Sequence, residues 1–204
     1  MDVRKIRETT IALLDEPDLL DPVAGVPRHH QAVSEAVISG DVWARAELVG
    51  VSVSRSWFLD ADLSSAKFEG GAFDRCVFRR CSMIGMRWDG LAAKDVIMEN
   101  CRLDYAFLAE IKTTGPIAFL GCSLTDTTIK DGKLGRALFD CCKLAGVTFD
   151  GPDLRGADLR GNDISGLTGA TALRGVTLSA AQIPTLTELL LQELNIKIKS
   201  EPLP

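Results

Sequence analysis

The chain of 204 residues has no long apolar segment. No uninterrupted apolar run approaches the ~18 residues that a membrane-spanning helix needs. The short apolar stretch at residues 11–14 is followed at once by Asp15 and Glu16, so the apolar region of a secretory signal peptide is missing. These absences argue against a membrane protein and a secreted protein, and they predict a cytoplasmic one.

Histidine is also scarce, because the chain contains only His29 and His30. Neighbours in sequence do not face one another on a helix, and no cysteine lies near them in the sequence to complete a metal site. The chain has no Walker loop, no G-x-S-x-G elbow and no H-E-x-x-H motif. The sequence therefore predicts no catalytic residues, no metal and no cofactor, and we expect a protein that is not an enzyme.

What the sequence does contain is a period of five residues. ADLSS at 61–65, AKFEG at 66–70 and ADLRG at 157–161 are examples. The third place of each quintet is almost always Leu, Phe, Ile, Met, Val or Trp, and the first is mostly small. This phase holds from Ala46 to Ser165 with one extra residue, Pro116, and weaker quintets extend it back to Gln31. A fixed short period is typical of a solenoid.

A period of five fits neither a β-strand nor an amphipathic α-helix. It fits a chain that turns a corner after every quintet, so that four quintets close one square coil. Stacked coils would pair their backbones about 4.8 Å apart. First-place residues would then stack at the corners, and third-place residues would fill the centre, so that each repeat buries its apolar side against its neighbours.

The six cysteines fit the same phase. Five of them occupy first places, where small apolar side chains are expected, and there is no C-x-x-C pair. We therefore expect buried, reduced thiols at Cys76, Cys81, Cys101, Cys122 and Cys142. Cys141 falls in a fifth place and is expected at the surface.

The quintets ADLSS, AKFEG, ADLRG and NDISG resemble the pentapeptide-repeat family, and the resemblance covers more than half of the chain. It implies an all-β solenoid, a right-handed quadrilateral parallel β-helix. The best-understood members are rod-shaped dimers that bind DNA gyrase or topoisomerase IV, mimic duplex DNA and protect against quinolones or natural-product poisons. Because the repeat is a scaffold, it indicates the fold more strongly than the activity.

Three parts of the chain follow from this pattern: an N-terminal cap at residues 1–30, the β-helix at 31–178 and a C-terminal helix and tail at 179–204. In the first part, one apolar spacing predicts a short amphipathic helix that covers the open N-terminal end of the core. Its residues are Val3, Ile6, Thr10, Leu13 and Leu14. Pro116 predicts a bulge at one corner.

The tail permits two interpretations, a cap over the last coil or a dimer interface. TELLLQEL has more leucines than one narrow helix face can bury, which favours a homodimer formed through the C-terminal segment. The candidate dimerisation residues are Leu186, Leu189, Leu190 and Leu194.

Assigning the quintets to four faces in rotation separates the charges. One face has an acid on each successive coil: Glu47, Glu69, Asp89, Glu110, Asp131 and Asp150. The next face is rich in bases: Arg55, Arg75, Lys94, Lys112, Lys133, Arg136 and Arg155. The net charge of the chain is −5.

Two hypotheses for the function follow. The acidic face could occupy a groove for DNA phosphates on a type II topoisomerase, which is the partner that the resemblance implies. Alternatively, the rod is a non-catalytic scaffold for an unrelated protein, and its basic face would suit an acidic partner. Direct binding of nucleic acid is a weaker interpretation, because the basic face lacks interleaved aromatics. The charges could also simply pair across coils.

Overall fold

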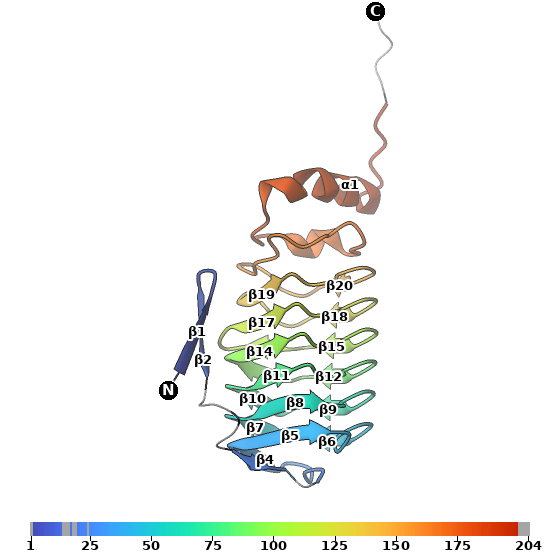
Figure 1. Cartoon of the computed structure of the whole chain (residues 1–204). Helices are drawn as coiled ribbons and strands as arrows, with labels where there is room; N and C mark the ends of the chain where they lie inside the picture. Colours follow the sequence, from blue (N-terminus) through green and yellow to red (C-terminus); the bar gives the residue numbers. More distant parts are fainter. Residues whose placement is uncertain (1, 14–16, 18–19, 24, 200–204) are drawn as a thin grey trace, which may run out of the picture.

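The computed structural model of the chain is a stack of square coils (Figure 1). It describes residues 2–13, 17, 20–23 and 25–199. Four quintets build each coil, so that strands twenty residues apart lie side by side in parallel, as Phe58 and Phe78 do. The predicted quadrilateral parallel β-helix is thereby confirmed, including the weak quintets that begin at Gln31.

Three walls of the rod are parallel sheets. The acidic wall consists of β6 (Glu47–Val49), β9 (Lys67–Glu69), β12 (Arg87–Asp89), β15 (Phe107–Ala109), β18 (Thr128–Lys130) and β20 (Thr148–Asp150). The basic wall consists of β4 (Ala32–Ser34), β7 (Ser52–Ser54), β10 (Ala72–Asp74), β13 (Ala92–Lys94) and β16 (Lys112–Thr113).

The third sheet, the hairpin wall, consists of β3 (Asp21–Pro22), β5 (Ala36–Gly40), β8 (Trp57–Ala61), β11 (Val77–Arg79), β14 (Val96–Glu99), β17 (Ile117–Leu120) and β19 (Ala137–Asp140). The fourth side, the turn wall, is held by single bridges between Asp62, Ser82, Arg102, Ser123 and Lys143.

The core is the column of third-place residues that the sequence predicts. Phe58 and Phe78 stack with their ring centroids 4.2 Å apart, and Phe119 and Phe139 stack at 4.8 Å. All four side chains are buried. The five first-place cysteines are buried as free thiols, whereas Cys141 is exposed, as predicted.

The corners explain the choice of fifth-place residues. The fifth residue of most quintets has a positive φ, as in Arg75 (54°) and Asp95 (53°), and glycine fills many of the equivalent places. A few corners also need glycine for space. A Cβ added to Gly71 would lie 2.0 Å from the carbonyl oxygen of Val51.

The predicted bulge lies where the sequence places it. Ala93 pairs with Thr113, an offset of twenty, whereas Val96 pairs with Ile117, an offset of twenty-one. The extra residue is thus absorbed between Thr113 and Ile117, at the corner that leads from the basic wall to the hairpin wall.

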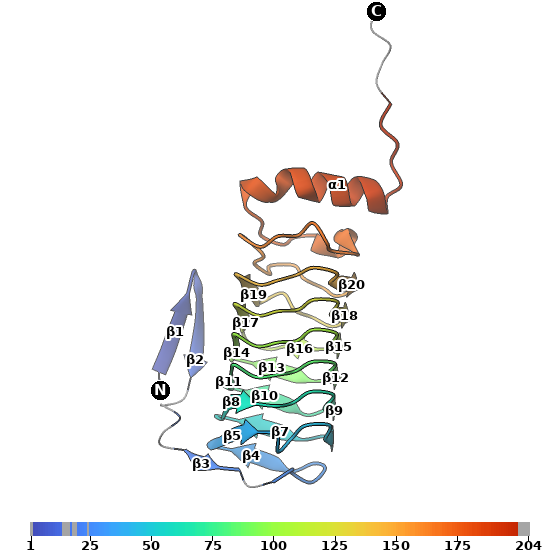
Figure 2. The same ribbon diagram turned by 45° about the vertical axis from the view of Figure 1, so that its right-hand side comes forward.

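The predicted N-terminal helix is wrong. Residues Asp2–Ile6 (β1) and Thr9–Leu13 (β2) form an antiparallel hairpin instead, with Arg7 and Glu8 in its turn. Leu14 lies outside the described residues. The hairpin runs along the side of the rod rather than across its end (Figure 2). Its residues Ile6 and Ile11 are buried against apolar side chains of the hairpin wall.

The apolar patch under the hairpin consists of second-place residues. Side chains in this place point outward, and on the other walls they are mostly polar. On the hairpin wall they form a buried column: Trp57, Val77, Ile97, Ala118 and Leu138. This column would be exposed to water without the hairpin, which explains why two strands pack there and not at the end of the rod.

The C-terminal end carries the predicted helix. After the 3₁₀ segments η2 (Ala170–Leu173) and η3 (Ala180–Gln182), the helix α1 (Ile183–Glu193) lies across the last coil (Figure 2). Leu189 is buried in the main core, so α1 closes this end of the rod. Within the described residues, no helix is long and apolar enough to cross a membrane.

Candidate partner-binding walls

The acidic wall presents its six predicted residues one coil after another. Four of them lie within strands: Glu47 in β6, Glu69 in β9, Asp89 in β12 and Asp150 in β20. The other two, Glu110 and Asp131, occupy the corners directly after β15 and β18, each with φ of 50°. The acids therefore share one wall but stand in three different places of the quintet.

The strand register shows how these acids are distributed. Glu69 pairs with Asp89, but the next two residues in that column are Ala109 and Lys130, and Asp150 follows. Glu47 stands in another column, beside Lys67. The result is a wall with an acid on every coil and no continuous file of carboxylates.

Basic residues neutralise part of this wall. Lys67 Nζ lies 2.7 Å from Glu47, Arg87 Nη2 lies 3.3 Å from Asp89, and Lys130 is paired with Asp150. The hydrogen bond from Lys67 lowers the pKa of the exposed Glu47 carboxyl. Within the described part of the chain, the exposed carboxylates of Glu69, Glu110 and Asp131 have no ion-pair partner.

Sequence reasoning missed one feature in the middle of this wall. Phe107 points outward, as its second place predicts, but its ring is half-buried because the Arg87 guanidinium lies 4.2 Å from the ring centroid. The two residues are register partners on β12 and β15. A basic residue one coil before an outward aromatic is the signal that could have predicted this contact.

The seven predicted bases lie along the basic wall. Lys94 and Lys112 lie within β13 and β16, and Arg55 and Arg75 lie at the corners after β7 and β10. Lys133, Arg136 and Arg155 lie on the coils that continue this sheet. Three arginines are ion-paired on the wall: Arg55 with Glu35, Arg75 with Asp74, and Arg155 with Asp153. The bidentate contact with Arg155 lowers the pKa of the Asp153 carboxyl.

The remaining bases of this wall form a basic patch, in which Asp153 is one of the two register partners of Lys133. It consists of Lys94, Lys112, Lys133 and Arg136, none of which has an ion-pair partner in the parts of the chain described above. All four are exposed. Lys112 and Lys133 are direct register partners, which places two like charges side by side at an electrostatic cost.

Neither histidine belongs to a catalytic or metal constellation. His29 Nδ1 accepts a hydrogen bond from the backbone N–H of Val49 at 3.1 Å, and the His30 ring lies against the corner at Gly50. Both histidines therefore pack against the corner at Val49 and Gly50. No group of three His, Cys, Asp or Glu side chains within the described residues is arranged to hold a metal ion.

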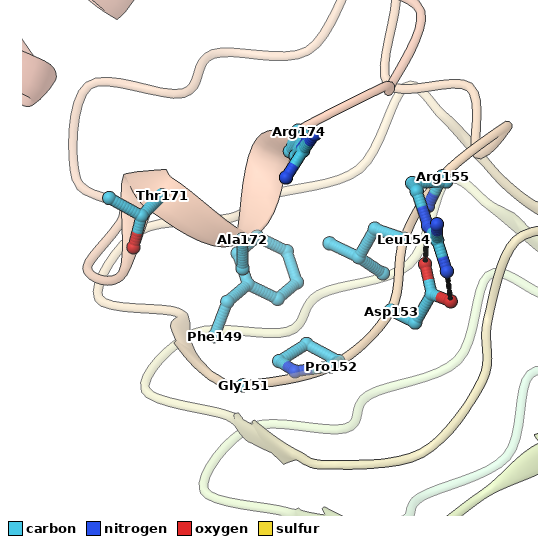
Figure 3. Close-up of a pocket in the computed structure, with 9 residues that line it drawn as sticks. All are labelled: Phe149, Gly151, Pro152, Asp153, Leu154, Arg155, Thr171, Ala172 and Arg174. Atoms are coloured by element: carbon cyan, nitrogen blue, oxygen red, sulfur yellow. Dashed lines mark hydrogen bonds and ion pairs between the residues drawn. The ribbon is translucent and has the colours of Figure 1, made fainter.

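A hollow of about 380 Å³ lies at the C-terminal end, between the last coils and η2 (Figure 3). Phe149, Leu154 and Ala172 form its apolar side, and Arg155 and Arg174 lie at its rim. The charged residues Asp153 and Arg155 are engaged with each other at this rim.

The four candidate dimerisation leucines do not form one surface. Leu189 is buried, and Leu186 and Leu190 are half-buried against the main core. Leu194, just after α1, is 54% exposed. Three of the four thus contribute to the cap, and a dimer formed through them stays a prediction.

Comparison with known proteins agrees with the repeat. Residues 122–161 match the family described as Pentapeptide repeats, in eight copies. No curated protein sequence matches the chain. Among solved structures, it is similar to full-length QnrB1, a plasmid-mediated fluoroquinolone resistance protein, with 16% identity over 80% of this chain and 98% of that one and a TM-score of 0.39.

Another similar structure is HetL, a pentapeptide repeat protein involved in heterocyst differentiation regulation from the cyanobacterium Nostoc sp. strain PCC 7120. Its identity to this chain is 18% over 76% of this chain and 86% of that one, with a TM-score of 0.32.

Proposed function

Because the chain is a pentapeptide-repeat protein whose acids recur along one uncovered wall, we propose that it binds a type II topoisomerase such as DNA gyrase. The acidic wall would occupy the positively charged groove that otherwise holds duplex DNA, and binding would modulate the action of topoisomerase poisons. The observation that carries this proposal is the acid on each of six successive coils.

The spacing of the coils supports this mode of binding. With a rise of about 4.8 Å per coil, the rod presents one carboxylate on each coil of this wall, at positions that shift sideways from coil to coil. A groove for a DNA strand, which carries a phosphate about every 3.4 Å, attracts such carboxylates largely independently of sequence.

The ion pairs on the acidic wall do not prevent such binding. Lys67–Glu47 and Lys130–Asp150 are solvent-exposed pairs, and pairs of this kind typically contribute less than about 1 kcal/mol. Lysines and arginines of a partner could replace them at little cost. Glu69, Glu110 and Asp131 need no such exchange, because they have no ion-pair partner within the described residues.

The test is a supercoiling assay with purified gyrase, with and without a poison. The chain should inhibit supercoiling or relieve poisoning, and the triple variant Glu69→Lys, Asp89→Lys, Glu110→Lys should lose that effect. A charge-matched control is Asp41→Lys, Asp126→Lys, Asp163→Lys, three exposed acids that lie outside the acidic wall. The proposal fails if the acidic-wall variant keeps full activity, or if both triple variants lose it equally.

A second candidate is a scaffold that binds an acidic protein surface through the basic wall. The neighbouring lysines 112 and 133 support it, because an anionic group of a partner placed beside both would offset the repulsion between them. The variant Lys94→Glu, Lys112→Glu, Lys133→Glu separates the two candidates. If the acidic wall binds gyrase, this basic-wall variant should keep the effect on gyrase. If it loses the effect while the acidic-wall variant keeps it, the basic wall is the binding surface.

A further inference from the structure

One segment of the chain has the sequence of a coil strand but lies outside the stack. After α1, Ile196–Lys199 reads I-K-I-K, the same alternation as V-S-V-S at Val51–Ser54, which contains β7. Side chains 196 and 198 are 52% and 77% exposed, and no strand is formed there. In both views the chain after α1 leads away from the coils (Figures 1 and 2).

The opposite end of the rod has a free strand edge. β4 is the outermost strand of the basic wall and pairs only with β7. The N–H of Ser52 donates to the carbonyl of Gln31, and the N–H of Glu35 donates to the carbonyl of Ser54. In a parallel ladder these odd-numbered residues of β4 face β7, so the N–H and C=O groups of Ala32 and Ser34 point away from the stack.

These outward backbone groups have no partner among the described residues. No described residue forms a hydrogen bond with the backbone of Ala32 or Ser34 on the free side, and both residues are exposed. An unpaired edge of this kind is a template for another strand. At the C-terminal end, by contrast, α1 lies across the last coil and covers its edge.

The edge adjoins a hollow with suitable chemistry. This hollow of about 520 Å³ is lined by β4 and by the segment before it. Val23, Val26 and Val33 contribute apolar surface, Asp21 contributes a carboxylate, and Glu35 contributes one that is paired with Arg55. An isoleucine flanked by two lysines complements such a hollow in both shape and charge.

We propose that Ile196–Lys199 of one copy adds to β4 of a second copy as a parallel strand. Ile198 then lies beneath the half-buried Val33, and Lys197 and Lys199 lie beside Ala32 and Ser34 on the outer face. The added segment supplies the coil strand that β4 lacks, and it joins the rods head to tail.

The segment cannot reach the edge of its own chain. The seven strands of the hairpin wall span six spacings of about 4.8 Å, so β3 and β19 lie about 29 Å apart, and α1 lies beyond β19. The N–H of Ile196 is bonded to the carbonyl of Leu191, which ties the segment to the end of α1. The three residues from there to Lys199 extend only about 10 Å. The occupant must therefore come from a second copy.

Sedimentation velocity of the full chain over a range of concentrations tests this proposal, with a reductant present because Cys141 is exposed. The wild-type chain should form dimers and longer species as its concentration rises. Ile198→Asp, which removes the inward apolar residue, should stay monomeric. Ser34→Pro should do the same, because it removes an outward N–H without touching the ladder to β7. Ile198→Val and Ser34→Ala are the matched controls and should assemble.

Mixing the two disabled variants distinguishes head-to-tail joining from other arrangements. Ser34→Pro retains an intact tail and Ile198→Asp retains an intact edge, so an equal mixture should form a heterodimer that grows no further. A two-fold contact between C-terminal ends would instead leave Ser34→Pro dimeric by itself, and that result would overturn the proposal. A wild-type chain that remains monomeric at ~100 µM would also overturn it. Equal melting temperatures for all variants, measured at a concentration at which the wild-type chain is monomeric, verify that the fold is retained, because association would itself raise the melting temperature.

Discussion

The place of a residue within its quintet decides what its side chain contributes to stability. Third-place residues lie in the core and second-place residues point outward, as the buried Phe78 and the half-buried Phe107 show. The sequence predicts this division because every coil offers the same inward environment. It does not predict which charged neighbours pair, such as Lys67 with Glu47, because a long exposed side chain has several partners within reach.

We expect Phe78→Ala to destabilise the protein by about 3–5 kcal/mol, because it leaves a cavity beneath the stacked ring of Phe58. Phe107→Ala removes an outward, half-buried ring that contacts Arg87, and it should cost about 1 kcal/mol. Urea denaturation midpoints of both variants measure the difference. Similar losses of unfolding free energy in the two variants would contradict the assignment of Phe107 to a second place and Phe78 to a third place.

The N-terminal hairpin is the element that the sequence predicts least well. The spacing of Val3, Ile6, Thr10 and Leu13 fits a helix, but the β-branched run Thr9–Ile11 favours a strand. A stronger signal lies far away in the sequence. The apolar second-place column from Trp57 to Leu138 recurs on every fourth quintet, and outward apolar residues on a solenoid require a cover. Local periodicity cannot reveal this, because the cover and the covered residues are separated in the chain.

Ion pairs from the middle of β1 and from the turn of the hairpin hold it on the rod. Arg4 contacts Glu99 at 2.8 Å, and Arg7 contacts both Asp140 and Asp158. Arg7→Met should release the turn of the hairpin and accelerate tryptic cleavage after Arg4. The matched control is Lys5→Met, since the side chain of Lys5 is exposed and has no ion-pair partner within the described residues. Equal cleavage rates in the two variants would show that the apolar contacts suffice.

The ion pairs of Arg4 and Arg7 also make the stability of the protein depend on pH. Hydrogen bonding to Arg4 lowers the pKa of Glu99. Burial tends to raise the pKa of Asp158, but hydrogen bonds from Arg160 and Arg7 outweigh it and lower this pKa to about 2. A carboxyl with a lowered pKa stabilises the folded state above its ordinary pKa and loses that effect as the pH falls through the lowered value.

The melting temperature should therefore be level from pH 7 to about 5 and fall between about pH 4 and 2. Arg7→Met should have a lower melting temperature at pH 7, and its melting temperature should fall less in acid. The reason is that the ion pairs of Arg7 with Asp140 and Asp158 are already lost. Thermal melts monitored by circular dichroism across this range measure both effects. Parallel curves for the variant and the wild type would exclude a contribution from Arg7.

For the molecule as a whole, the four-quintet coil is the unit in which the rod can be lengthened or shortened. Residues 61–80 form one complete coil, with strands β9, β10 and β11. Deleting them joins Asp60 to Cys81 and leaves every later residue on its own wall. Deleting only residues 66–80 turns the rest of the rod by one wall, which carries Glu99, Asp140 and Asp158 away from the hairpin.

The twenty-residue deletion should thus disturb the folded structure less than the fifteen-residue deletion. The twenty-residue deletion should melt in one cooperative transition and keep the hairpin resistant to trypsin, because stability in a solenoid depends on contacts between neighbouring repeats. The fifteen-residue deletion should expose the column from Trp57 to Leu138, accelerate cleavage after Arg4, Lys5 and Arg7, and promote aggregation. If the smaller deletion is tolerated as well as the larger one, position on a wall is not what holds the hairpin. The assignment of partner binding to particular walls would then lose its structural basis as well.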